Sequence, residues 1–132
     1  MRVVLDTNIY ISAFLFAGKA RKVLELLIEN RIGAFISDEI LNEIKQVLNR
    51  EKFGLDKEHV DAIITEIAGI THKVYPDESI RHVCRDSADH IILECAVKSK
   101  ADFIITGDHD LLVLQDFLGT HIISPAPFLE KN

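Results

Sequence analysis

The sequence has 132 residues, 48% hydrophobic and 27% charged, which is enough for one domain with a buried core and too apolar for disorder. It contains no apolar run that could cross a bilayer, Asp6 interrupts any N-terminal secretion signal, and Cys84 and Cys95 fit buried thiols in a reducing cytoplasm. The net charge of −6 disfavours nucleic acid as a partner, unless bound cations cancel acids gathered in one place.

The first half of the chain alternates short β-branched runs with stretches whose apolar residues recur at helical spacing. In the helix that starts at Ser37, for example, Ile40, Ile44 and Leu48 share one face. Asp56 is placed to cap the helix that follows. In order, these patterns predict a strand at residues 2–5, helices at 8–16 and 21–30, a strand at 33–36, and helices from 37 and over 55–70.

The second half continues this alternation, and proline or glycine marks where strands stop. A strand at residues 72–75 is stopped by Pro76, and a loop leads from there to Asp86. Strands that alternate with helices predict βαβ units, and so a mainly parallel sheet covered on both faces in a single domain over residues 1–132. The remaining predicted elements are a helix at 88–100, a strand at 103–106, a short helix at 111–117 and a strand at 121–124.

Polar residues gather where the predicted strands end. In a sheet of this kind, ligands bind beyond the carboxyl ends of the strands, near the point where the strand order reverses. Topology alone would therefore bring acids that are far apart in the sequence to one edge. The residues on that edge are Asp6, Thr7 and Asn8 after the first strand, 37–43 after the second, Asp86 and Asp89 before the fourth, and Thr106, Asp108 and Asp110 after it.

Such a cluster of carboxylates has a chemical consequence. Carboxylates held within a few ångströms repel one another, and one or more must take up a proton unless a cation is bound. Hard oxygen ligands favour Mg²⁺ or Mn²⁺ over zinc. A divalent ion held by carboxylates is the usual machinery for phosphodiester hydrolysis, since it activates water and neutralises charge on phosphate oxygens. The pattern therefore favours a metal-dependent nuclease.

The acids of the first half also have purely structural explanations. Asp6 could cap the next helix, although Asn8 is equally well placed for that, and an Asp against a buried strand is costly without a partner. Glu43 lies at the edge of the apolar stripe of its helix and could simply be salt-bridged. Asp38 and Glu39 are expected to be solvated or to act on the helix dipole.

The same alternatives hold for the acids of the second half. Asp86 and Asp89 have the spacing of a capping box, and we expect Asp86 to be the cap and Asp89 the ligand. Either Asp108 or Asp110 could cap the short helix after Gly107, and Asp108 is favoured as the functional acid because it is nearer the strand end. Asp102 is expected at the surface. Weak candidates to guide a substrate backbone, or else plain surface, are Lys19, Arg21, Lys22, Arg50, Arg81 and Arg85.

Four motifs taken together resemble the PIN-domain family of nucleases. Each motif alone is weak, but they occur in the expected order and on the expected elements, and the resemblance covers the chain from Met1 to about Leu129. The motifs are LDTN at residues 5–8, SDEILNEI at 37–44, RDSAD at 85–89 and ITGDHDLL at 105–112.

The resemblance implies a Rossmann-like three-layer α/β/α sandwich with a five-stranded parallel sheet in the order 3-2-1-4-5. It implies an endoribonuclease with one or two Mg²⁺ or Mn²⁺ ions. The pattern of Asp86 with Asp110 resembles that of a VapC-like subgroup, the toxins of toxin–antitoxin pairs. Many relatives are homodimers, and the toxins are neutralised by a small antitoxin. The metal-binding acids would be Asp6, Glu43, Asp89 and Asp108, and the residues that position ligands or water would be Asn8, Thr106, Asp86 and Asp110.

Other functions stay open at this stage. The chain could be a housekeeping RNA-processing nuclease, or a non-catalytic interaction module with the same fold. A receiver-like phosphoacceptor domain also places acids beyond its first strand, but it needs a Lys after its last strand, where this chain has Ser124 and Pro125. A phosphatase with an Asp nucleophile in a DxD turn would need a second Asp at position 8, which is Asn8.

Overall fold

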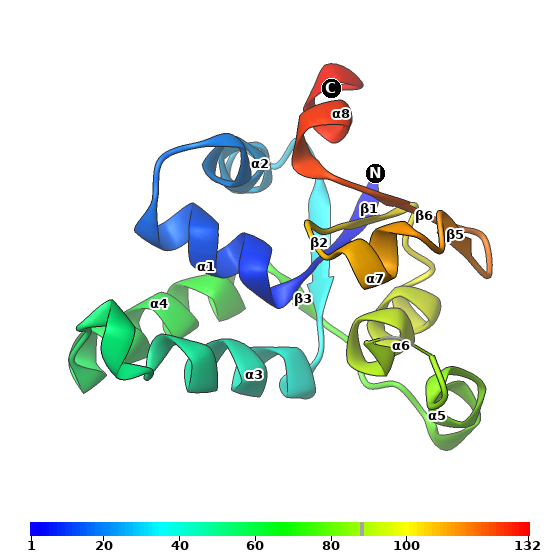
Figure 1. The fold of residues 1–132 in the computed structure, drawn as a ribbon, viewed down its shortest axis with the longest axis horizontal. Helices are drawn as coiled ribbons and strands as arrows, with labels where there is room; N and C mark the ends of the chain where they lie inside the picture. The colour runs from blue at the N-terminus through cyan, green and yellow to red at the C-terminus, as the bar shows by residue number, and fades with distance from the viewer. Residues whose placement is uncertain (88) are drawn as a thin grey trace.

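The computed structural model describes residues 1–87 and 89–132 (Figure 1). Residue 88, where the predicted helix over 88–100 begins, lies outside the described residues. The elements are β1 (Arg2–Leu5), α1 (Thr7–Leu15), α2 (Lys19–Ile28), β2 (Gly33–Ile36), α3 (Asp38–Leu48), a 3-10 turn η1 (Glu51–Phe53), α4 (Lys57–Ile70), β3 (His72–Lys73), α5 (Glu78–Cys84), α6 (His90–Ser99), β4 (Phe103–Ile105), α7 (His109–Leu112), β5 (Asp116–Phe117), β6 (Thr120–Ile123) and α8 (Pro125–Glu130).

The sheet confirms the predicted arrangement of the five parallel strands and adds one strand. Within the described residues its order is β3-β2-β1-β4-β6-β5, so β6 takes the place expected of the fifth strand. The prediction of five strands, all parallel, was wrong at one edge, because β5 pairs antiparallel with β6. Left-handed backbone at Gln115, Leu118 and Gly119 turns the chain back on itself there, which ends the helix predicted over 111–117.

Two helices occupy segments for which the sequence predicted none. The expected loop before Asp86 contains α5, which Asp77 caps by accepting a hydrogen bond from the Ile80 amide (3.0 Å). Beyond the last strand, Pro125 does not simply end the strand but starts α8 as its first residue, a position where its missing amide hydrogen has no role.

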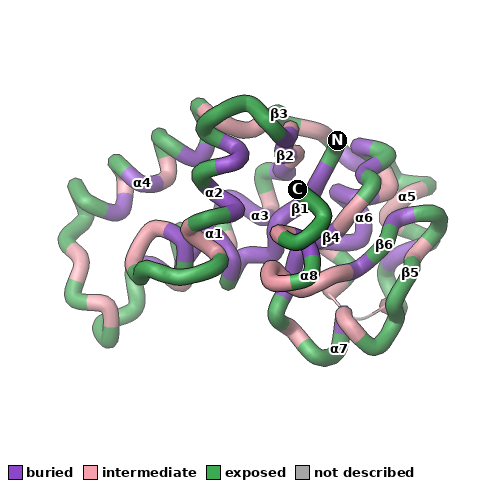
Figure 2. The backbone as a smooth tube through the Cα atoms, turned by 90° about the horizontal axis from the view of Figure 1, so that it is seen from above, coloured by how far each residue is buried: buried purple, intermediate pink, exposed green. Residues whose placement is uncertain are grey.

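Helices cover both sides of the sheet, as Figure 1 and Figure 2 show. α6 packs against β1, β2 and β4, with α5 outside it, while α1, α2 and α8 lie on the other side. The central strand β1 is buried from Val3 to Leu5, and Cys84 and Cys95 are buried free thiols, as predicted. No helix in the two described ranges has both the length and the apolar character needed to cross a membrane.

The core fixes where β1 and β4 end. Leu5 is in register with Ile105, and the Asp6 amide donates to the Ile105 carbonyl (3.0 Å). After β1 the chain builds β2 and β3 on one side of β1, and it returns to place β4 and β6 on the other. The strand order therefore reverses between β1 and β4, and the carboxyl ends of these two strands lie side by side at the place where α/β sheets bind ligands.

Candidate metal centre

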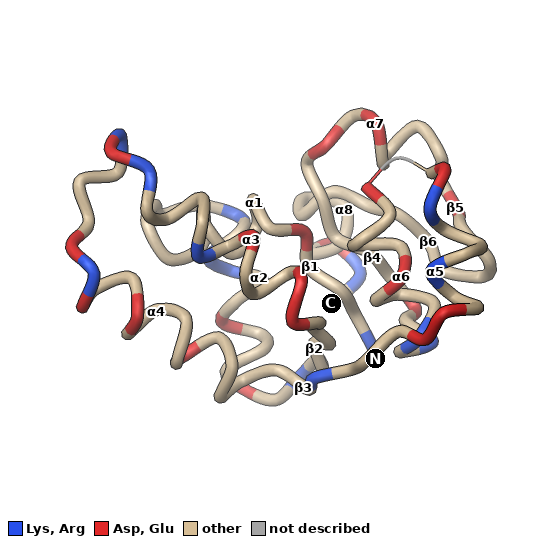
Figure 3. The backbone as a smooth tube through the Cα atoms, turned by 90° about the horizontal axis from the view of Figure 1, so that it is seen from below, with Lys and Arg blue, Asp and Glu red and all other residues tan. Residues whose placement is uncertain are grey.

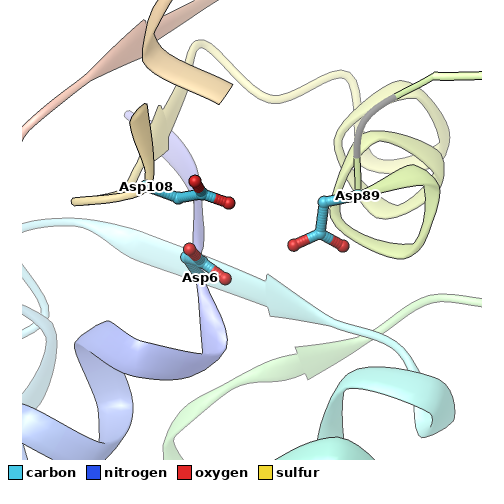
Figure 4. Close-up of side chains that lie close together, drawn as sticks. All are labelled: Asp6, Asp89 and Asp108. Atoms are coloured by element: carbon cyan, nitrogen blue, oxygen red, sulfur yellow. The ribbon is translucent and has the colours of Figure 1, made fainter. Parts of the chain in front are cut away.

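Three of the four acids implied as metal ligands meet at the carboxyl ends of β1 and β4. Carboxylate oxygens of Asp6, Asp89 and Asp108 all lie within 4.8 Å of one another. Their side chains point toward a common space from β1, from the start of α6 and from the segment after β4 (Figure 4). Positions 6, 89 and 108 thus form one cluster, as the predicted topology required.

Asp6 is held at the junction between β1 and α1, with only 4% of its surface exposed. The Thr106 hydroxyl donates a hydrogen bond to Asp6 Oδ2 (2.7 Å), and the same hydroxyl oxygen accepts one from the Asp108 amide (2.9 Å). Thr106 is itself fully buried. This single hydroxyl therefore fixes the carboxylate of one acid and the backbone of another. The role of Thr106 toward a ligand or water stays a prediction.

Asp108 combines the two roles that the sequence left open. It is the N-cap of α7, and its Oδ1 accepts a hydrogen bond from the Asp110 amide (3.0 Å). Its carboxylate nevertheless remains within the three-acid cluster. Asp110 is exposed and belongs to the first turn of α7. The choice of Asp108 over Asp110 as the acid nearest the strand end agrees with this geometry.

Asp89 also serves as a cap, and the prediction that Asp86 would cap the helix was wrong. α6 begins at His90, and Asp89 Oδ1 accepts a hydrogen bond from the Ile92 amide (3.4 Å). The backbone of Asp89 is left-handed (φ 43°, ψ 62°), a conformation that non-glycine residues adopt at a cost and that recurs at functional sites. The helix starts later than its apolar pattern suggested, so the second acid of the capping pair takes the cap position.

The electrostatic state of the cluster follows from burial and from mutual repulsion. Burial raises the pKa of Asp6, and the charges of Asp108 and Glu43 raise it further, against the lowering effect of the Thr106 hydrogen bond. Burial and then the charge of Asp6 raise the pKa of Asp89 to about 6. Figure 3 shows acidic residues around the ends of β1 and β4, and basic residues on the segments leading into α2 and α4. None of the ion pairs among the described residues involves Asp6, Asp89 or Asp108.

The other site residues implied by the resemblance lie around this cluster and not in it. Glu43, half-buried on α3, is near enough for its charge to act on Asp6 and Asp89, but its oxygens are outside the three-acid group. Asn8 and Asp86 have exposed side chains, like Asp110. Their roles toward a ligand remain predictions.

Several residues expected at the surface have partners on distant elements, which the sequence did not predict. Glu39, expected to be solvated or to act on the helix dipole, lies in the first turn of α3 and forms an ion pair (2.5 Å) with Arg81. Arg81 had been a candidate to guide substrate or else plain surface. Asp38 pairs with Lys73 (2.8 Å). Asp102, expected at the surface, is exposed and accepts a hydrogen bond from the Arg2 amide (2.8 Å).

Two buried polar groups near the site were missed. Glu94 on α6 is buried among apolar residues, and the sequence signal for it is an acid inside the stripe formed by Leu93 and Ala96. The Thr7 hydroxyl, adjacent to Asp6, is buried with no hydrogen-bond partner among the described residues. Its position in the LDTN motif was noted, but nothing in the sequence predicted that it would be left without a partner.

The donor set of the cluster fits Mg²⁺ or Mn²⁺. All three groups are carboxylates, whose hard oxygens suit these ions, and the cluster includes no histidine or cysteine that would favour zinc. Burial first, and then the neighbouring acids, raise the pKa values of Asp6 and Asp89, so their charged forms are disfavoured at this site. A divalent cation would remove that penalty, because it stabilises the ionised carboxylates.

Replacing Thr106 by Val should weaken the site while keeping its shape. Thr106→Val removes the hydroxyl that serves Asp6 and the Asp108 amide, so we expect a loss of ~1–3 kcal/mol in stability and a roughly 10- to 100-fold weaker affinity for Mn²⁺. Thermal unfolding and Mn²⁺ titration measure the two effects. Thr120→Val is the matched control, since this buried hydroxyl donates to the Ala101 carbonyl (2.8 Å) at the opposite end of the sheet. Equal Mn²⁺ affinity in both variants would contradict the role of Thr106.

Comparison with known proteins agrees with this fold. The family model described as "PIN domain" matches residues 2–110, and no curated protein matches the chain. Among solved structures, the chain is similar to one in the crystal structure of VapBC2 from Rickettsia felis bound to a DNA fragment from their promoter. The TM-score is 0.66 at 15% identity, over 94% of this chain and 98% of that chain, which is a likeness of fold. Because the family match spans well over half of the sequence and includes all three clustered acids, the chain belongs to the PIN-domain family.

Proposed function

We propose that this protein is an endoribonuclease that depends on Mg²⁺ or Mn²⁺ and hydrolyses RNA phosphodiester bonds. The observation that carries the proposal is the cluster of Asp6, Asp89 and Asp108 at the point where the strand order reverses. PIN domains are generally nucleases, and family membership gives this cluster its most direct use. The proposed unit is the whole chain, residues 1–132, acting as one domain in the cytoplasm.

In this proposal the metal ligands are Asp6, Asp89 and Asp108, with Glu43 beside them to hold a metal or its water. The ion, when bound, supplies Lewis acidity for water activation and offsets charge that develops on the phosphate oxygens. The chain keeps the ligands in place beforehand. Thr106 orients the Asp6 carboxylate, and caps on α6 and α7 fix Asp89 and Asp108, so little reorganisation is needed when substrate binds.

The proposed biological role is that of the toxin of a toxin–antitoxin pair. Support comes from the similarity in fold to a chain of the VapBC2 complex and from the Asp86 and Asp110 pattern of the sequence. A small antitoxin and a second copy of the chain would then be its protein partners. Expression of the protein should arrest growth, and co-expression of the small protein encoded beside it should relieve the arrest. Normal growth would favour a housekeeping RNase.

The nuclease activity is tested by incubating the purified protein with defined single-stranded RNA and DNA of the same sequence. With millimolar Mg²⁺ or Mn²⁺ we expect cleavage of the RNA, and none with a chelator, because the cluster needs a cation to hold its charges together. The same cation should raise the melting temperature, since it binds only the folded state. Cleavage that persists in chelator, or the absence of any thermal shift with Mn²⁺, would contradict a metal centre at this cluster.

A further inference from the structure

Arg81 connects two helices that carry acids of the proposed metal site. Its Nη1 donates to Glu94 Oε1 on α6 (3.0 Å), and its Nη2 pairs with Glu39 Oε2 on α3 (2.5 Å). Arg81 itself belongs to α5. One guanidinium thus links α3, α5 and α6, which are separate in the sequence. We call Arg81, Glu39 and Glu94 together the Arg81 clamp.

The burial of Glu94 holds the Arg81 clamp in its observed arrangement. The Glu94 side chain is 3% exposed, and in the described part of the chain no other basic side chain pairs with it. A buried carboxylate without a partner is costly, so the guanidinium is held where Glu94 requires it. Two carboxylates therefore engage the Arg81 guanidinium, which leaves it less suited to guiding a substrate, one role that the sequence had suggested.

The members of the clamp lie close in sequence to the acids of the site. Glu39 precedes Glu43 by four residues on α3, which places both on the same side of that helix. Glu94 lies five residues after Asp89, the cap of the same helix α6. A link between Glu39 and Glu94 thus sets how far the start of α6 stands from α3.

The site gives a reason why this spacing has to be imposed. Asp89 is held in left-handed backbone directly before α6, and its charge interacts with those of Asp6, Glu43 and Asp108. Mutual repulsion would move these acids apart if their helices could shift. The charge of Arg81 is taken up by Glu39 and Glu94, so Arg81 acts on the cluster through the position of the helices.

We propose that Arg81 is a positioning residue of the metal site, which holds α3 and α6 at the spacing that lets Glu43 and Asp89 serve one ion. This inference rests on the metal-dependent function proposed above. A planar guanidinium can satisfy two carboxylates in a fixed geometry, which the single ammonium of a lysine cannot reproduce. The requirement is therefore for arginine and not only for a positive charge.

The test is a Mn²⁺ titration of the purified protein, with the melting temperature in chelator measured in parallel. Arg81→Met and Arg81→Lys should each weaken Mn²⁺ binding by about 10- to 100-fold, the range found when residues that orient metal ligands are replaced. Lys73→Met is the matched control, because it removes an ion pair to α3 that makes no link to α6. Its Mn²⁺ affinity should equal that of the wild type.

A double variant separates the effect of Arg81 on the position of the helices from its effect on the stability of the fold. Arg81→Met alone leaves the Glu94 carboxylate buried without a partner, and this could unfold the protein. In the double variant Arg81→Met, Glu94→Met, two apolar side chains of similar volume replace the ion pair, so the melting temperature in chelator should recover. The Mn²⁺ affinity should stay weak, because α3 and α6 are no longer linked.

The outcomes distinguish the two proposals. Recovery of wild-type Mn²⁺ affinity together with the melting temperature in the double variant would overturn the clamp, since Arg81 would then only stabilise the fold. Wild-type affinity in Arg81→Lys would overturn the need for a guanidinium. If the wild-type protein itself bound no Mn²⁺, the metal centre would fail and the clamp with it. Binding that is equally tight in wild type and Arg81→Met would overturn the clamp alone.

Discussion

Asp6→Asn should abolish RNA cleavage and leave the protein folded. The substitution keeps the size of the side chain, and its amide oxygen can still accept the hydrogen bond from Thr106. It removes the most buried negative charge of the cluster, so the rate of cleavage should fall by ~10²–10³-fold or more, as when a group that stabilises charge in the transition state is removed. Single-turnover cleavage of single-stranded RNA with Mn²⁺ measures the loss.

The same variant should be at least as stable as the wild type when no metal is present. Burial and the charges of Asp108 and Glu43 disfavour the ionised Asp6 carboxylate, and the neutral amide removes that penalty. Asp61→Asn is the control, since Asp61 is a half-buried acid of α4 paired with Lys45 (3.7 Å) and is not part of the cluster. Unchanged cleavage by Asp6→Asn would remove Asp6 from the mechanism, and a loss of folding would show that its charge is structural.

Asp89 should make the stability of the metal-free protein depend on pH. Its pKa is about 6 in the folded state and 3.8 in the unfolded state, so the folded state binds more protons between these values. Stability from this residue is therefore full only below pH 3.8 and is lost as the pH rises from there through 6. At pH 7.5 in chelator, Asp89→Asn should be more stable than the wild type by ~1–3 kcal/mol, or roughly 5–10 °C in Tm.

Several features make this comparison specific. Asparagine caps helices as well as aspartate does and tolerates left-handed backbone, so the substitution changes mainly the charge. Asp77 is a control of opposite sign, because the Ile80 amide and the Ser79 hydroxyl lower its pKa, and Asp77→Asn should gain nothing at pH 7.5. Mn²⁺ should reverse the order by stabilising the wild type more than Asp89→Asn. A difference that stays constant from pH 4.5 to pH 7.5 would contradict the raised pKa.

Most of the helices and strands could be predicted from the sequence, because the patterns that indicate them are local. The short apolar runs at residues 2–5 and 33–36 became β1 and β2, and caps such as Ser37 and Asp56 marked where α3 and α4 begin. α5 and β5 were missed for the opposite reason. Both are short, and their stability comes from packing on α6 and from pairing with β6, which a local pattern does not record.

For the site, the sequence by itself determined which acids follow which strands, and a parallel sheet then brings Asp6 and Asp108 together whatever the details. Only the tertiary structure decided that Asp89 caps α6 in left-handed backbone, that Glu43 stands beside the cluster, and that Arg81 belongs to an ion pair with buried Glu94. The physical reason is one of range. Helix-capping hydrogen bonds and hydrophobic periodicity act over a few residues, whereas the burial that shifts a pKa or requires an ion pair depends on packing between distant elements.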